Sequence, residues 1–91
     1  MIKLENEKIR SEKYYSVGFD KENNRYLLSV VITWVAWFKR YYLISNEEYD
    51  WYDTNLWKLD LLAEECYNDK TSSERFVYSE REDENKNTHN V

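Results

Sequence analysis

The chain of 91 residues has no proline, one glycine, one cysteine and one histidine. Cys66 cannot form a disulfide within the chain, and the acidic residues that follow and precede it oppose the thiolate of a catalytic cysteine. His89 lies in a polar C-terminal stretch, which argues against a catalytic triad or a histidine-based metal site. No glycine-rich loop can bind phosphate. We therefore expect no catalytic residue, no metal site and no cofactor.

Long hydrophobic runs are also missing. The longest run, Val30 to Phe38, is interrupted by Thr33 and is well short of the roughly 18 residues that a transmembrane helix requires. The N-terminal residues MIKLENEKIR lack the apolar stretch of a signal peptide. We expect a cytoplasmic protein that does not bind membranes.

Aromatic residues, in contrast, are abundant. The chain has four Trp, nine Tyr and three Phe, and each buried ring removes about 150–250 Å² from water. This supply of rings compensates for the modest core that a single domain of this length can form. Four rings with strand-like spacing are predicted to build the core: Phe19, Tyr26, Trp34 and Phe76.

Charge is distributed unevenly along the chain. Residues 1–44 hold eight Lys and Arg against five Asp and Glu, whereas residues 45–91 hold five against thirteen, for a net charge of −5. An acidic half of this kind repels nucleic acid and attracts basic partners. It is equally typical of a surface that is merely solvated.

Four segments alternate between apolar and polar residues or are rich in β-branched side chains, which predicts strands. They are residues 12–20, 25–36, 38–45 and 74–80. The polar sequence DKENN from Asp20 is predicted to close a hairpin, and a second turn is expected near residues 36–40. Gly18 indicates a bulge or a close backbone approach. Both faces of the second strand are apolar, so this strand should be central and covered on both sides.

Helix signals follow the third strand. Ser45 and Glu48 have the spacing of a capping box, which predicts a short helical turn. Asp53 or Thr54 is predicted to cap a longer helix of about residues 54–68, with a core stripe of Leu56, Leu59, Leu62, Ala63, Cys66 and Tyr67. The predicted fold is α+β, an antiparallel sheet of about four strands with one main helix packed on one face. Residues 1–81 form the domain, and residues 82–91 are predicted to be a disordered tail.

Two features of the acidic half suggest a partner-binding surface. Trp57 and Leu61 lie off the core stripe and are flanked by carboxylates, as in a docking ridge with a Trp anchor; alternatively, Trp57 folds over the edge of the core. The segment from Asn46 to Asp53 places carboxylates around aromatic rings, which could bind Lys or Arg of a partner, although Glu47 and Glu48 also suit an ordinary helix N-terminus. The candidate residues are Glu47, Asp50, Trp51, Asp53, Trp57, Asp60, Leu61 and Glu64.

Two other functional interpretations have less support from the residues. Glu64 and Glu65 are adjacent and point to different sides of a helix, so they do not form the carboxylate pair of a glycosidase. The basic-aromatic sequence at residues 39–42 could be a platform for single-stranded nucleic acid. In an acidic protein it is better interpreted as an edge strand kept soluble by its charges.

Three stretches carry a resemblance: NEEYDWYD at residues 46–53, LWKLDLLAEECY at residues 56–67 and SERFVYSE at residues 73–80. With its acidic α+β character, the chain resembles the bacterial immunity proteins of contact-dependent growth inhibition and related polymorphic toxin systems. The resemblance implies one-to-one binding to a cognate toxin domain, often a basic nuclease, whose active site or a neighbouring surface is blocked. The alternatives are a structural or adaptor module that self-associates through its aromatic surface, and an acidic DNA mimic that inhibits a DNA-binding enzyme.

Overall fold

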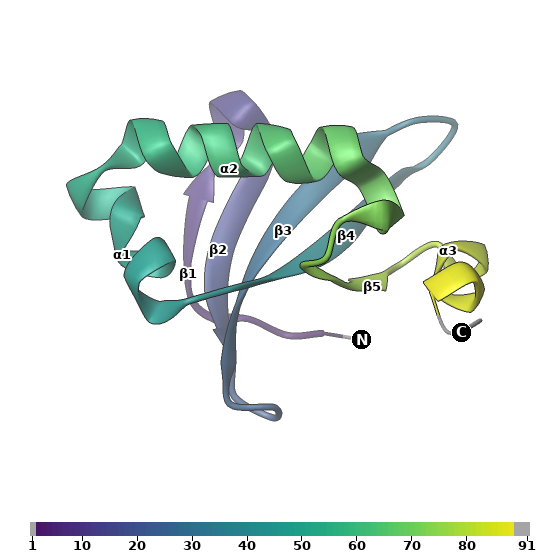
Figure 1. Cartoon of the computed structure of the whole chain (residues 1–91), viewed down its shortest axis with the longest axis horizontal. Coiled ribbons are helices and arrows are strands. Elements are labelled where there is room, and N and C mark those ends of the chain that lie inside the picture. The colour runs from purple at the N-terminus through teal and green to yellow at the C-terminus, as the bar shows by residue number, and fades with distance from the viewer. Residues whose placement is uncertain (1, 89–91) are drawn as a thin grey trace.

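The computed structural model describes residues 2–88. Its centre is a five-stranded antiparallel sheet in which the strands follow one another in chain order (Figure 1). The strands are β1 (Glu5–Arg10), β2 (Tyr15–Asp20), β3 (Arg25–Thr33), β4 (Trp37–Ile44) and β5 (Phe76–Ser79). The predicted α+β class is confirmed, with one strand more than expected. That strand is β1, whose sequence ENEKIR is charged because most of its side chains face solvent.

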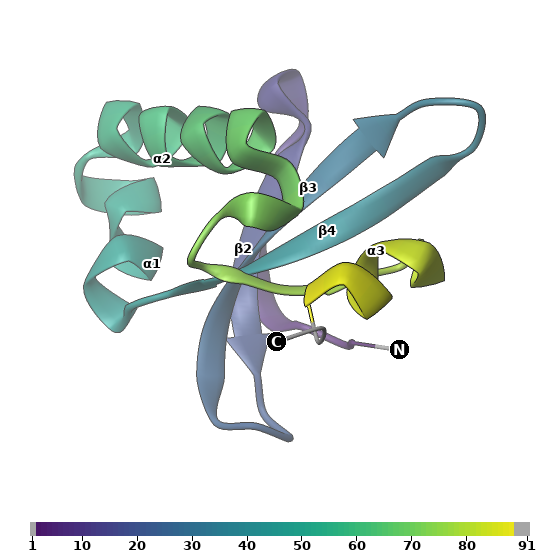
Figure 2. The same cartoon turned by 45° about the vertical axis from the view of Figure 1, so that its right-hand side comes forward.

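Helices lie mainly on one side of this sheet. The longest, α2 (Leu56–Asp69), runs across one face, and α1 (Asn46–Thr54) lies at the end of the sheet near β1 (Figures 1 and 2). Helix α3 (Glu82–Thr88) follows β5 on the opposite side of the molecule from α1. Two short 3₁₀ turns, η1 (Ser11–Lys13) and η2 (Lys70–Ser72), complete the fold. No helix among residues 2–88 is long and apolar enough to cross a lipid bilayer.

The core lies between α2 and the sheet. Alternate residues of the strands point toward the helix because successive side chains of a strand face opposite sides. They meet the helix residues whose spacing predicted an apolar stripe, and the strand and helix residues form one cluster: Tyr15, Val17, Leu28, Val30, Ile32, Tyr42, Ile44, Tyr49, Leu59, Leu62, Ala63 and Cys66. Burial raises the pKa of the Cys66 thiol to about 11, so this cysteine is an apolar core residue. Tyr26 and Phe76 pack against the cluster as predicted.

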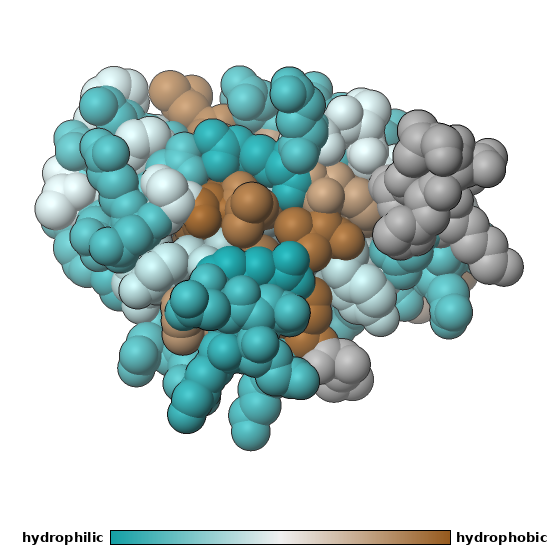
Figure 3. All heavy atoms as spheres, turned by 60° about the horizontal axis from the view of Figure 1, so that its bottom comes forward, coloured by the Kyte–Doolittle hydropathy of each residue, from teal (hydrophilic) through white to brown (hydrophobic). Residues whose placement is uncertain are grey.

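The opposite face of the sheet is also partly covered, as expected for β3, where Leu27 and Ser29 are buried. Leu4 crosses β2 at Gly18, and a Cβ atom on this glycine would lie only 2.7 Å from the Leu4 Cβ. The single glycine therefore marks a close approach of two chain segments. Figure 3 views the molecule from below in the orientation of Figure 1 and shows hydrophobic side chains in the middle of this face, surrounded by hydrophilic ones.

The β3–β4 turn differs from the prediction. It occupies residues 34–36, before the expected position, so β3 ends at Thr33 and β4 begins at Trp37. The assignment of Trp34 to the core is wrong, because this ring lies at the tip of the hairpin and is 60% exposed. The error arose because the run of apolar residues continues without interruption through the turn.

A single residue, Asn55, separates α1 from α2. The Ser45–Glu48 capping box is present and starts α1 as predicted, but α1 is a full helix of 9 residues. The predicted caps of the next helix are wrong, since α2 begins after Asn55. Asp53 instead pairs with Lys8 of β1, and the Thr54 hydroxyl donates to the Asp50 carbonyl, so neither side chain is available for capping.

Strand β4 lies between β3 and β5, so the interpretation of residues 39–42 as a strand edge is wrong. Arg40 is buried and its guanidinium binds both carboxylate oxygens of Glu84, with N–O distances of 2.9 and 2.7 Å. This pair holds α3, which occupies residues 82–88 of the segment predicted to be disordered; residues 89–91 and His89 with them lie outside the described residues. The hydrogen bond from Arg40 lowers the pKa of Glu84.

Side chains occupy backbone groups at both outer edges of the sheet. The phenols of Tyr49 and Tyr52 in α1 donate to the carbonyls of Asn6 and Ile9 in β1, at 2.6 and 2.7 Å. At the other edge, the Asn85 amide accepts from the Ser79 N–H and donates to the Ser79 carbonyl, both at 2.8 Å. These contacts limit pairing with other chains, which exposed strand edges otherwise invite.

Candidate partner-binding surface

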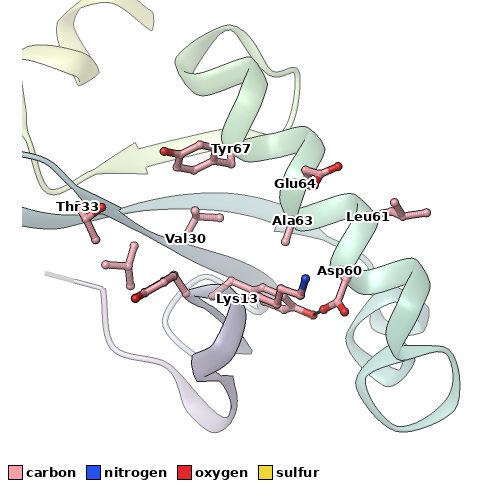
Figure 4. Close-up of a pocket in the computed structure, with 11 residues that line it drawn as sticks. Lys13, Val30, Thr33, Asp60, Leu61, Ala63, Glu64 and Tyr67 are labelled. Carbon is pink, nitrogen blue, oxygen red and sulfur yellow. Dashed lines mark hydrogen bonds between the residues drawn. The ribbon is translucent and has the colours of Figure 1, made fainter.

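A groove of about 460 Å³ lies between α2 and the neighbouring ends of β2 and β3, a volume in the range of protein binding sites. Figure 4 shows α2 along one wall and η1 along the other, with β3 between them. Residues from all of these elements line it: Lys13, Tyr14, Tyr15, Val30, Val31, Thr33, Asp60, Leu61, Ala63, Glu64 and Tyr67.

The groove exists because β3 extends past the first residue of β2, so the last residues of β3 have no β2 residue opposite them. The β2–β3 pairing stops at Tyr15 opposite Val30, whereas β3 continues to Thr33. The chain before β2 turns aside at Tyr14, which has a left-handed backbone with φ 58°. The last residues of β3 therefore have β4 on one side and the groove on the other.

Tyr14, which lines the groove, belongs to a group of exposed rings that continues to the β3–β4 hairpin. Tyr14 makes an edge-to-face contact with Trp37, with 6.2 Å between ring centroids, and both rings are largely exposed. Beyond Trp37, the hairpin tip presents Trp34, against which the Arg81 guanidinium lies at 4.5 Å, and Val35, which is 87% exposed. Large apolar side chains exposed together in this way are typical of interaction sites.

Helix α2 exposes both residues of the ridge predicted from the sequence, of which Leu61 lines the groove and Trp57 does not. Trp57 and Leu61 are 62% and 57% exposed, and their spacing of four residues makes them neighbours on the helix surface. Leu61 and Glu64 line the groove, and Tyr67 is half exposed at its end. Tyr67 was predicted to belong to the core stripe, and this assignment is wrong because the sheet below it ends at the groove.

Asp60 has a structural role on the same wall. Its carboxylate accepts hydrogen bonds from Arg10 at 3.2 and 3.1 Å and from the Tyr15 phenol at 2.6 Å. Burial disfavours its charge, but the hydrogen bonds from Arg10 and Tyr15 outweigh this effect and lower the pKa of Asp60. Burial, together with the Asp60 hydrogen bond, raises the pKa of Tyr15. The network fastens α2 to β1 and β2 beneath the groove.

The remaining predicted residues lie on α1. Glu47 and Asp50 are exposed, and Asp53 pairs with Lys8. Trp51 is only partly exposed and packs against the core, with the Lys58 ammonium 5.5 Å from its ring. The structure thus brings Asp60, Leu61 and Glu64 together at the groove and places the α1 residues apart from it.

The side of the molecule formed by α1 and α2 carries more negative charge than its ion pairs neutralise. Within residues 2–85, several carboxylates on α1 and α2 have no ion-pair partner: Glu47, Asp50, Glu64, Glu65 and Asp69. Lys58 is the basic residue that α1 and α2 contribute. A partner that meets this side gains from positive charge.

Four exposed residues of this surface were not predicted from the sequence to belong to it: Tyr14, Trp34, Trp37 and Tyr67. The two Trp residues bracket Val35 and Ala36, and a turn placed between them would have put both rings at a hairpin tip. The groove itself depends on the different lengths of β2 and β3, which no local pattern reveals.

No protein-family model matches the chain, and the same is true of curated proteins and of solved structures. Among the described residues, no group of three His, Cys, Asp or Glu side chains is placed to hold a metal ion.

Proposed function

We propose that this protein is a non-enzymatic binding protein that neutralises a cognate protein toxin by occluding it, as toxin-immunity proteins do. The observation that carries the proposal is the groove bordered by exposed Tyr14, Leu61 and Tyr67, with Trp37 in contact with Tyr14. Aromatic side chains dominate the binding energy of protein interfaces, and here they are exposed on a domain whose core is complete without them.

The charge of the helical side supports a basic partner. The carboxylates without ion-pair partners on α1 and α2 would attract a positively charged domain and accelerate its association. A toxin nuclease that binds nucleic acid has such a surface, which an acidic inhibitor can cover.

The first test is protection of cells. The C-terminal domain of a large protein encoded next to this gene is expressed with and without this protein. Growth with the pair and arrest with the toxin domain alone would support the proposal. Arrest in both cases, with both proteins folded, would contradict it.

Once the toxin domain is identified, alanine variants show which surface of this protein binds it. Leu61→Ala should weaken binding by about 1 kcal/mol or more, and Trp57→Ala by at least as much. Leu43→Ala is the matched control, because Leu43 is also exposed but lies on β4, away from the groove. Equal affinities for Leu61→Ala and Leu43→Ala would contradict the assigned surface.

Self-association through the same rings is the alternative outcome. Light scattering of the protein alone distinguishes it: a monomer that becomes a one-to-one complex fits an immunity protein. An oligomer that is dispersed by Trp37→Ala would indicate the self-associating module.

A further inference from the structure

The groove contains an unpaired length of strand as well as apolar walls. In an antiparallel pair, a residue directs its N–H and C=O to the same neighbouring strand, and the next residue directs them to the other side. The Val31 N–H donates to the Tyr14 carbonyl at 2.9 Å, so the odd-numbered residues of β3 face the β2 side. Thr33 therefore directs its N–H and C=O toward the groove.

No described strand pairs with β3 beyond this point on the β2 side. The Tyr14 N–H, which would bind the Val31 carbonyl in a regular ladder, donates instead to the Ser11 carbonyl at 3.2 Å. The Val31 carbonyl and both backbone groups of Thr33 are consequently open at the floor of the groove, where Val31 and Thr33 are lining residues. The outer edges of β1 and β5 differ, since side chains occupy backbone groups there.

We propose that this groove binds an extended segment of the partner protein, which adds to the exposed end of β3 as a short antiparallel strand. This inference rests on the proposed function, because it specifies how the partner is recognised. Strand addition combines backbone hydrogen bonds with pockets for alternate side chains. Here the backbone bonds go to Val31 and Thr33, alternate side chains of the segment meet the Leu61 and Tyr67 side of the groove, and those between them meet Tyr14.

The charges of the two walls define the chemistry of the segment, and on the η1 wall Lys13 lies near Asp60 (Figure 4). Glu64 on the α2 wall has no ion-pair partner in residues 2–85, whereas Asp60 is already bound by Arg10. A Lys or Arg side chain of the segment would lie opposite Glu64. An apolar or aromatic side chain two residues away, on the same side of the added strand, would lie against Leu61 and Tyr67. The occupant is thus an extended segment in which a basic residue and an apolar residue are two positions apart, so that both side chains lie on the same side of the added strand.

Peptide display tests this inference without the natural partner. A library of random dodecapeptides is selected on the immobilised full chain, and the selected peptides are synthesised. We expect sequences with a basic and an apolar residue at a spacing of two, and we expect bound peptide to slow hydrogen exchange of the Thr33 amide. Peptides that leave this amide unchanged, or a selection that yields no binders, would overturn the inference.

Two substitutions at one position isolate the backbone contribution. Thr33→Pro removes the N–H that faces the groove, at a position where β4 does not use it, and should weaken peptide binding about fivefold to tenfold. Thr33→Val keeps the N–H and should bind as the parent does. Equal affinity of both variants, each with an unchanged thermal unfolding midpoint, would contradict strand addition.

Charge reversal provides a readout that does not alter the backbone. Glu64→Lys should weaken peptides that contain Lys or Arg, while Glu65→Lys, the neighbouring residue that does not line the groove, should have a smaller effect. The two proposals can fail separately. Peptide binding at Thr33 without protection from the toxin domain would contradict the immunity function, whereas an unchanged affinity of the Thr33→Pro variant for that toxin domain would contradict strand addition.

Discussion

Arg40 and Glu84 form a bidentate ion pair that connects the interior strand β4 to α3, 44 residues further along the chain. Ser79 donates to the same carboxylate at 2.7 Å. The pair replaces solvent around a guanidinium that is buried in the sheet.

Removing one member should therefore destabilise the protein more than removing both. Glu84→Ala leaves the Arg40 guanidinium buried without its partner and should lower the free energy of unfolding by about 2–3 kcal/mol. The double variant Arg40→Met/Glu84→Ala should recover part of this loss. Urea unfolding of both variants and of Arg40→Met gives the coupling energy, and strictly additive effects would show that the pair is energetically unimportant.

The pH dependence of stability follows from four carboxylates. The charge of Asp20 is opposed by burial, but hydrogen bonds from Asn23 and Arg25 outweigh this effect and lower the pKa of Asp20. Burial opposes the charge of Glu48, but hydrogen bonds from Arg75 and the Ser45 backbone outweigh it and lower its pKa. The pKa values of Asp60 and Glu84 are lowered as well. Each group binds protons less readily in the folded state, so its contribution is complete above its ordinary pKa and is lost as the pH falls through the folded-state value.

We therefore expect stability to be constant near neutrality and to fall below about pH 4.5, the ordinary value for Glu48 and Glu84. Urea unfolding between pH 7 and pH 2 measures this, and Glu84→Gln should show a shallower decline. Glu47→Gln removes an exposed charge without an ion pair and serves as the control. A decline that is identical in Glu84→Gln and the parent would contradict the assignment.

Gly18 allows the N-terminal segment to cross β2. In Gly18→Ala, the new methyl group would meet Leu4 at a distance that real contacts do not reach, so the segment must move away. We expect a loss of about 1–3 kcal/mol of stability, measured by thermal or urea unfolding. The change should be much smaller in a Leu4→Gly background, because the side-chain atoms that the new methyl group would meet are then absent.

The tyrosines of α1 protect the β1 edge. Tyr49→Phe keeps the ring, which packs 4.6 Å from the Tyr26 ring, but leaves the Asn6 carbonyl without its donor. We expect a loss of about 0.5–1.5 kcal/mol for this variant and a similar or smaller loss for Tyr52→Phe. Tyr78→Phe is the control, since the Tyr78 hydroxyl makes no hydrogen bond within the described part of the chain and its ring contact with Tyr41 is kept. Equal stability of Tyr49→Phe and Tyr78→Phe would show that the edge contact contributes nothing.

Local patterns predicted the parts of the fold that local forces determine. The alternation in β2, the polar turn after Asp20 and the capping box at Ser45 each involve neighbours in sequence. The core stripe of α2 was predictable for the same reason, except at Tyr67, where the supporting sheet ends.

The remaining features depend on contacts between distant residues. The sequence of β1 is polar because β1 is an edge strand. Helix α3 is held by the pairing of Glu84 with Arg40, which no local pattern reveals. Asp53 has the properties of a helix cap, but Lys8 of β1 takes its carboxylate. At the candidate site, the sequence identified the α2 ridge, because a helix face can be read from spacing, but not the groove, because its shape depends on where two strands end.

The occupied edges of the sheet also have a consequence for assembly. A sheet grows indefinitely by strand addition only if each added copy presents a further open edge. Here Tyr49 and Tyr52 take carbonyls of β1, and Asn85 takes both outer backbone groups of Ser79. The open stretch of β3 is short and is enclosed by α2 and η1. A strand that binds there would end the process after one step, so a chain rich in exposed rings can form a complex of defined stoichiometry rather than a fibre.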